Sequence, residues 1–200
     1  VEAGRYERVL IVSCDVASIA LNPKQKESFQ LFSDGAAAFV IEKTEKEIGV
    51  IDAIQKTWSE GAHSTEIRGG LSNFHPKNYS EMTKEEYMFD MNGKTVLSLS
   101  ISKIPELMKN FLKNNGMKVS DIDMTVPHQA SVAMTLIIQK LGIEKDKFLD
   151  EVKGFGNMVS ASVPITLAHG LENGRIKSGN TILLIGTAAG LTTNMMLIKL

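Results

Sequence analysis

Two polar side chains, His128 and Asn157, occupy positions from which they could act together on one carbonyl oxygen. His128 follows Pro127 at the end of a short β-type run, residues 124–126, and Asn157 follows a glycine-containing turn, residues 154–156. A neutral histidine donates one hydrogen bond from its ring, and an asparagine donates through its side-chain amide. Two neutral donors aimed at a carbonyl stabilise an enolate without protonating it. This chemistry suits decarboxylation or deprotonation beside a thioester.

The elements around His128 and Asn157 must place them at one edge of a sheet. Residues 131–141 carry apolar side chains at helical spacing, and a second helix is expected over residues 163–172. In an open α/β sheet, ligands bind outside the carboxyl ends of the strands. The separation of the two residues along the chain is not specific, so structural roles for both remain the more common interpretation at this point. The core-facing candidates of the first helix are Val132, Leu136, Ile137 and Leu141.

The remaining pattern alternates strands with helices, which is typical of an α/β protein. Pro105 is expected to kink the longest helix or to mark a restart within it. Residues 56–86 are predicted to form a long irregular loop, and the small residues 186–190 to form a loop between the last two strands. The strands are predicted at 7–14, 36–41, 50–55, 124–126, 181–185 and 195–199, and further helices at 94–111 and 143–148.

The composition is that of a soluble globular protein. The 200 residues include 43% hydrophobic and 22% charged side chains, and the net charge is −1. This balance provides no general attraction to nucleic acid or to an anionic membrane. No apolar run approaches the roughly 20 residues that span a bilayer, and the first residues lack a signal-peptide core. We therefore expect a cytoplasmic protein with neither a nucleic-acid nor a membrane partner.

The sequence contains no pattern that predicts a metal site or a disulfide. His63 and His75 are isolated from other residues that could serve as metal ligands. Cys14 is the only cysteine, which excludes an internal disulfide. Because Cys14 follows an apolar run, we interpret it as a small buried hydrophobe rather than a nucleophile.

The beginning of the sequence suggests a fragment of a longer protein. Val1 is the first residue, and a very apolar strand begins only a few residues later, at 9–13. A buried strand of this kind needs neighbours on both sides. We therefore expect further polypeptide before Val1.

Five motifs, taken in order, have a specific spacing. They are Phe32–Ala38, Met91–Gly93, Val126–Ala130, Gly156–Pro164 and Gly174–Lys177. Together they resemble the β-ketoacyl-acyl-carrier-protein synthase III family, which is the condensing branch of the thiolase superfamily. The resemblance covers essentially the whole chain.

The resemblance implies a duplicated thiolase-like α/β fold, layered α-β-α-β-α in the full protein. Residues 1–48 would be the tail of the N-terminal half, and residues 49–200 the complete C-terminal half. The family uses a Cys-His-Asn triad, in which His and Asn correspond to His128 and Asn157 here. The cysteine would lie upstream of Val1, because Cys14 does not match it. The 200-residue chain alone is therefore expected to form no acyl-enzyme.

Other family positions are altered in this sequence. Ala189 stands in the glycine-rich loop that supplies an oxyanion N–H, and its Cβ restricts φ where glycine would not. Gly93, Leu97 and Ser131 correspond to positions that contact substrate or pantetheine, with Leu97 replacing a gating Phe and Ser131 replacing Asn. Among the basic residues that dock a carrier protein, Lys140 remains, whereas Ala133 occupies another such position.

The resemblance implies decarboxylative Claisen condensation of an acyl-CoA starter with a malonyl-carrier-protein thioester. No cofactor or metal is expected, since CoA and phosphopantetheine thioesters serve as substrates. The expected partners are acyl-CoA and acyl carrier protein, and members of the family are typically homodimers. Two alternatives remain. The protein could be a non-catalytic partner subunit, or an acyltransferase that works without decarboxylation.

Overall fold

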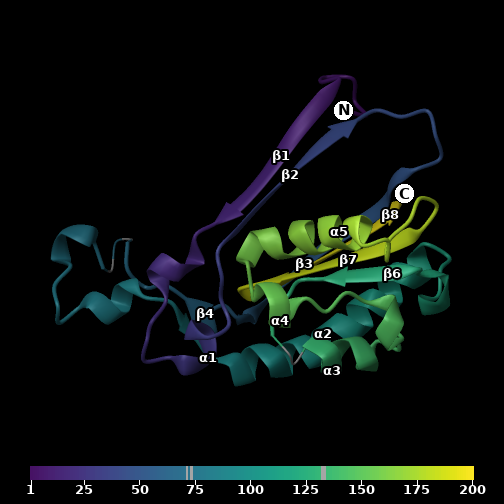
Figure 1. Ribbon diagram of the computed structural model, residues 1–200. Coiled ribbons are helices and arrows are strands. Elements are labelled where there is room, and N and C mark those ends of the chain that lie inside the picture. Colours follow the sequence, from purple (N-terminus) through teal and green to yellow (C-terminus); the bar gives the residue numbers. More distant parts are fainter. Residues whose placement is uncertain (71, 73, 132–133) are drawn as a thin grey trace.

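The computed structural model describes residues 1–70, 72, 74–131 and 134–200 (Figure 1). Its strands follow the apolar and β-branched segments of the sequence. They are β1 (Arg8–Asp15), β2 (Gly35–Glu42), β3 (Gly49–Gly61), β4 (Thr65–Glu66), β5 (Asp90–Met91), β6 (Met124–Pro127), β7 (Thr181–Ala188) and β8 (Gly190–Lys199).

The helices follow the segments with helical apolar spacing. The α-helices are α1 (Lys26–Phe29), α2 (Gly93–Asn114), α3 (Met134–Lys140), α4 (Val152–Phe155) and α5 (Ser162–Glu172). Short 3-10 turns are η1 (Ala17–Ala20), η2 (Pro76–Asn78), η3 (Lys84–Tyr87), η4 (Val119–Asp121), η5 (Lys145–Lys147) and η6 (Val159–Ala161).

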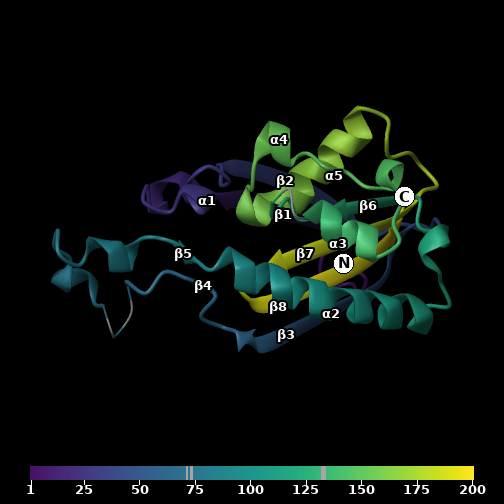
Figure 2. The same ribbon diagram turned by 90° about the horizontal axis from the view of Figure 1, so that it is seen from below.

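A four-stranded sheet in the order β3-β8-β7-β6 forms the centre of the structure. Strand β6 runs parallel to β7, whereas the β7–β8 and β8–β3 pairs are antiparallel. Helices α2 and α3 cover one face of this sheet and α5 covers the other (Figures 1 and 2). The predicted α/β fold is therefore confirmed, as a sheet between two helical layers.

Alternate residues of β7 divide the core into two clusters, as the twofold periodicity of a strand requires. Leu183 and Ile185 pack with α2 and α3, whereas Ile182 packs with Leu167 of α5. All three β7 side chains are at most 1% exposed. Both faces of the sheet are thus buried, which fixes the end of β6 from which His128 emerges.

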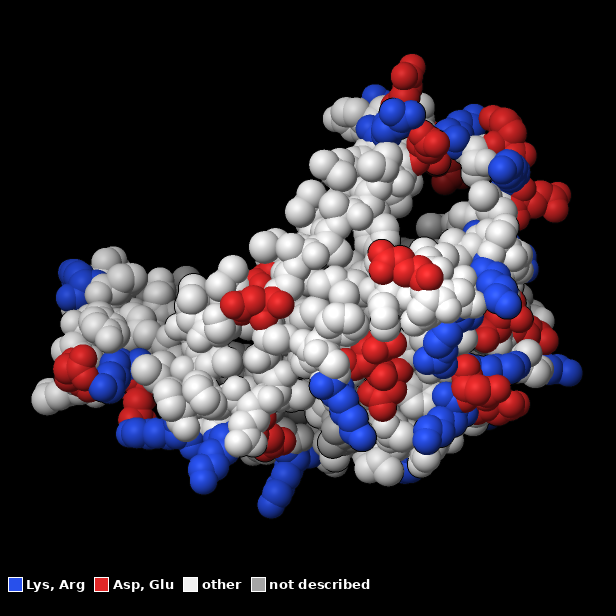
Figure 3. Space-filling view, viewed as in Figure 1, with Lys and Arg blue, Asp and Glu red and all other residues white. Residues whose placement is uncertain are grey.

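Strands β1 and β2 form a separate antiparallel ribbon, with Arg8 opposite Glu42 and Asp15 opposite Gly35. One face of the ribbon lies over α5, and Phe39 of β2 packs against the cluster beneath it. Its other apolar side chains lie at the surface, where Figure 3 shows a largely uncharged stretch with charges at its tip. The most exposed of these include Leu10, Val12 and Val40, at 63%, 62% and 59%.

Three predicted boundaries were wrong because strand pairing extends the strands beyond their apolar segments. Residues 186–188 belong to β7, since Gly186, Thr187 and Ala188 pair with Asn194, Thr193 and Thr192. For the same reason β8 begins at Gly190 and leaves Ala189 as the turn residue. Strand β3 continues to Gly61 along β8, so the irregular segment is shorter than 56–86.

Several side-chain predictions also need correction. Cys14 is exposed rather than buried, because β1 pairs only with β2 in this structure and the cysteine lies on the open part of the ribbon. Leu136 is 53% exposed, so it lies on the outer face of α3, whereas Ile137 and Leu141 are buried as expected. Helix α2 continues through Pro105 without a restart. Val132 and Ala133 lie outside the described residues.

The boundary between the proposed halves falls between two separate sheets. Strand β2 ends at Glu42 and β3 begins at Gly49. The division at residue 48 stays a prediction. In the described part of the chain, no helix combines the length and the apolar character needed to cross a bilayer.

Candidate active site

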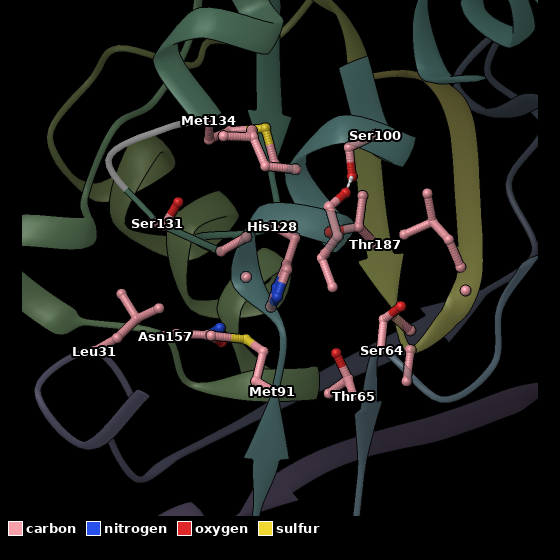
Figure 4. Close-up of a pocket in the computed structure, with 18 of the residues that line it drawn as sticks. Leu31, Ser64, Thr65, Met91, Ser100, His128, Ser131, Met134, Asn157 and Thr187 are labelled. Carbon is pink, nitrogen blue, oxygen red and sulfur yellow. Dashed lines mark hydrogen bonds between the residues drawn. The ribbon is translucent and has the colours of Figure 1, made fainter. Parts of the chain in front are cut away.

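His128 lies directly beyond the last residue of β6. Its backbone N–H donates to the carbonyl oxygen of Ile185 at 2.6 Å, which continues the β6–β7 ladder by one residue. The side chain is 9% exposed, and Figure 4 shows it directed into a cavity. Burial lowers the pKa of His128 from 6.5 to about 4. The imidazole is therefore neutral at physiological pH, as the predicted donor role requires.

Gln129 fixes the backbone on both sides of His128. Its side-chain Nε2 donates to the carbonyl oxygens of Pro127 and Leu149, at 2.9 and 3.0 Å, and its Oε1 accepts from the N–H of Glu151 at 2.8 Å. Gln129 is only 2% exposed, so these bonds form in a low-dielectric setting. They tie the end of β6 to the segment before α4 and leave little freedom for the backbone of His128.

We expect Gln129→Leu to destabilise the protein by about 2–3 kcal/mol, because it leaves buried backbone groups without their partners. Urea unfolding measures this change. Gln139→Leu, at an exposed position of α3, is the control and should change the free energy of unfolding by no more than about 0.5 kcal/mol. A loss below about 1 kcal/mol for Gln129→Leu would contradict the assigned role.

Asn157 is held by a segment far away in the sequence. Its N–H donates to the Leu31 carbonyl at 2.8 Å, and its carbonyl accepts from the Ser33 N–H at 2.9 Å. Asn157 and Phe32 thus form a parallel bridge between the two parts of the chain. The side-chain Oδ1 accepts from the Val159 N–H at 2.9 Å. Because Oδ1 is used in this way, Nδ2 is the atom available to donate into the cavity.

Gly156 allows the close approach of these two segments. Its φ is +72°, in the region that favours glycine. An added Cβ would lie 2.8 Å from the carbonyl oxygen of Leu31 and 2.9 Å from Oγ of Ser33. The hydroxyl of Ser33 also donates to the carbonyl of Phe155. The glycine is therefore required where the two segments meet.

One cavity of about 850 Å³ brings together six of the seven predicted site residues (Figure 4). Lys140 lies outside it, exposed at the end of α3. The rest of the lining is mainly apolar and includes Leu31, Phe89, Val96, Met134 and Ile137. The six are His128, Asn157, Ala189, Gly93, Leu97 and Ser131.

Gly93 begins α2 at the rim of this cavity. An added Cβ there would lie 2.3 Å from Oε1 of Glu27, whose carboxylate therefore abuts the helix N-terminus. Ala189 forms the turn between β7 and β8, and the positive φ in this turn, 139°, belongs to the neighbouring Gly190. Ala189 thus lines the cavity without adopting the backbone conformation that its Cβ disfavours.

The sequence patterns missed several residues that shape the cavity. Ser64 and Thr65 line it from the segment predicted to be irregular, and Thr187 lines it from a strand predicted to be a loop. The Phe32–Ala38 motif was a usable signal for the segment that holds Asn157. Cys14 is absent from the lining. Among the described residues, no group of His, Cys, Asp and Glu side chains could hold a metal ion.

Comparisons with known proteins converge on one family. Residues 1–58 match the model of 3-oxoacyl-[acyl-carrier-protein] synthase III, and residues 112–200 match the model of its C-terminal part. The chain is 32% identical over 201 residues to a β-ketoacyl-[acyl-carrier-protein] synthase III of Clostridium perfringens, covering 100% of the chain and 61% of that protein. It is 33% identical to the Staphylococcus haemolyticus protein of the same description, covering 100% of the chain and 59% of that protein.

Solved structures show the same relationship. A crystal structure of a 3-oxoacyl-(acyl-carrier-protein) synthase III matches with a TM-score of 0.92 and 26% identity, over 100% of this chain and 62% of that one. The structure of the protein of the same name from Pseudomonas aeruginosa matches with a TM-score of 0.85 and 26% identity, over 99% of this chain and 59% of that one. The chain spans about three-fifths of the length of these relatives. It has a thiolase-like fold and belongs to the 3-oxoacyl-[acyl-carrier-protein] synthase III family.

Proposed function

We propose that this chain provides the decarboxylation site of a β-ketoacyl synthase III-like condensing enzyme. The observation that supports this most strongly is the convergence of a neutral, buried His128 and an amide donor of Asn157 on one mainly apolar cavity. A low-dielectric cavity strengthens hydrogen bonds to a developing negative charge. The substrate would be a malonyl thioester, and the second reactant an acyl thioester.

In the proposed reaction, the bond between the malonyl carboxylate and its α-carbon breaks and carbon dioxide leaves. The electron pair moves onto the thioester carbonyl oxygen, which accepts hydrogen bonds from His128 and Asn157. The resulting enolate carbon attacks the acyl thioester carbonyl, and the acyl–sulfur bond breaks with release of the thiolate. The N–H of Ala189 would stabilise the oxyanion formed in that attack.

The nucleophile that holds the acyl group would be a cysteine upstream of Val1. Among the described residues that line the cavity there is no cysteine, which also fits the alternative of a non-catalytic partner subunit. Mass spectrometry after incubation with an acyl-CoA separates these interpretations. The encoded protein should gain one acyl group on the upstream cysteine, and the 200-residue chain alone should gain none. An adduct on Cys14 would contradict the proposal, whereas an encoded protein without any adduct would favour the partner subunit.

The remaining family properties are proposals for this chain. Acyl-CoA and acyl carrier protein would be its substrates and partners, with the exposed Lys140 at the carrier-protein surface. The protein would be a cytoplasmic homodimer and would work without a cofactor. An acyltransferase without decarboxylation, on the same residues, is distinguished by the absence of carbon dioxide release.

The protonation state of His128 should contribute no change in the rate of carbon dioxide release between about pH 8 and about pH 5.5. The reason is that the pKa of this residue is lowered to about 4, so the ring stays neutral over the whole range. Saturating malonyl thioester and a rapid buffer exchange keep the measurement on the catalytic step. An inflection near pH 6.5 that disappears in His128→Asn would show that the ring titrates as an exposed histidine.

The same burial has a consequence for stability. Because the pKa of His128 is lower in the folded than in the unfolded state, the unfolded chain binds more protons between about pH 4 and 6.5. His128 therefore destabilises the fold progressively as the pH falls through this window. Once the pH is low enough to protonate the ring in the folded state as well, His128 has lowered the free energy of unfolding by about 3 kcal/mol. His128→Asn should remove this part of the acid sensitivity, as measured by urea unfolding at pH 7 and pH 4.5.

A further inference from the structure

Asp15 links the ribbon to the turn that contains Asn157. It is the last residue of β1, and its Oδ2 accepts from the backbone N–H of Ser160 at 3.0 Å. The same oxygen accepts from the hydroxyl of Ser160. Ser13, two residues earlier on β1, donates its hydroxyl to Oγ of Ser160 at 2.7 Å. Ser160 is thus held through both its backbone and its side chain.

The turn held by Asp15 has an unfavourable backbone conformation. Val159, between Asn157 and Ser160, has a φ of +51°. A β-branched residue rarely adopts a positive φ, so the conformation persists only where the surroundings impose it. On one side of Val159, its own N–H is bonded to Oδ1 of Asn157. On the other side, the N–H of the next residue is bonded to Asp15, a contact from outside the turn. Within the turn, the Met158 N–H donates to Oγ of Ser162 and the Ala161 N–H donates to the Met158 carbonyl, both at 3.0 Å.

We propose that Asp15 is a positioning residue for Asn157. By holding Ser160, its carboxylate keeps Val159 in the left-handed conformation and its N–H on Oδ1 of Asn157. Nδ2 of Asn157 is thereby kept toward the cavity. Asp15 does not line the cavity, whereas Val159, Ser160 and Asn157 do, so it acts through these residues rather than on the substrate. The proposal rests on the proposed function of Asn157.

The rates of the two half-reactions, acyl loading and carbon dioxide release, distinguish this positioning role from a general contribution to folding. In the proposed reaction, acyl loading of the nucleophile does not use Asn157, whereas carbon dioxide release does. In the protein as encoded in full, Asp15→Ala should lower kcat for carbon dioxide release at least tenfold, with KM within twofold and the acyl-loading rate unchanged. Asp15→Asn should keep most of the activity, because an amide oxygen can still accept from the Ser160 N–H. Glu7→Ala is the matched control, because it removes an exposed carboxylate immediately before the same strand, and it should match the unaltered protein.

Hydrogen exchange provides a measurement that does not depend on the reaction. In Asp15→Ala, the backbone N–H of Val159 should exchange at least tenfold faster. The N–H of Glu151, which donates to Oε1 of Gln129, should keep its rate. If Asp15→Ala does not fold, Asp15→Ser serves instead, because its shorter polar side chain cannot place an oxygen where Oδ2 of Asp15 lies, and Val159 exchange should rise at least threefold. Unchanged Val159 exchange, or a proportional fall in the rates of both half-reactions, would overturn the proposal.

Failure of the proposed function is recognised separately, by unchanged carbon dioxide release in Asn157→Ala.

Discussion

His128→Ala is expected to lower carbon dioxide release from a malonyl thioester by roughly 100- to 1,000-fold, the range observed when one donor to an oxyanion is removed. The ring is buried, neutral and directed into the cavity. Removing it therefore takes away a donor that solvent would replace only with poorly oriented water. Asn157→Ala should have an effect of similar size, and the double variant less than the product of the two, because both act on one oxygen.

The matched control is His75→Ala. His75 is exposed, its ring accepts from the N–H of Lys77, and it does not line the cavity, so carbon dioxide release should stay within twofold. Rates are compared under saturating substrate, after circular dichroism has shown that each variant is folded. A fall of less than threefold in His128→Ala would show that this side chain is not a decarboxylation donor.

Gly156→Ala is the substitution with the largest expected effect on stability. The backbone at Gly156 has a positive φ, which an alanine rarely adopts. The new Cβ would also lie closer than 3.0 Å to two atoms of the Leu31–Ser33 segment. Neither the backbone oxygen of Leu31 nor the bonded Ser33 can move without breaking the bridge to Asn157. We expect a loss of about 3 kcal/mol, from the unfavourable conformation and the overpacking together.

Gly154→Ala is the control for Gly156→Ala. Gly154 lies in α4, and an added Cβ there would meet nothing within 4 Å. Alanine at this position should be neutral or stabilising by up to about 1 kcal/mol. Urea unfolding at equal m-values measures both changes. If the two variants had the same stability, the close approach at Gly156 would not be what holds Asn157 in place.

Local periodicity predicted the elements whose apolar faces are formed by neighbouring residues. The long helix α2 and the α5 helix are of this kind, as are the cores of β1 and β6. The ends of β3, β7 and β8 could not be predicted in this way, because pairing with a distant strand decides them. Cys14 illustrates the same limit, since its exposure depends on which strands flank β1.

The candidate site was predictable only in part. Neither His128 nor Asn157 could be distinguished from a structural residue by spacing alone. The family motifs selected both, and their catalytic roles stay a prediction. The residues that hydrogen-bond the segments around them are Gln129, Leu31, Ser33 and Asp15. Their partners lie about 20 to 145 positions away along the chain, and no local pattern signals a hydrogen bond at such separations. The motif Phe32–Ala38 marked one of these segments without indicating its partner.

The most direct test of the central claim is to measure labelled carbon dioxide released from a malonyl thioester by the encoded protein, in the presence of an acyl-CoA. We predict that one carbon dioxide is released for each 3-oxoacyl product formed. Carbon dioxide release and product formation should both be lost in Asn157→Ala. A protein that binds the malonyl thioester but releases no carbon dioxide would contradict the account and support a non-catalytic partner subunit.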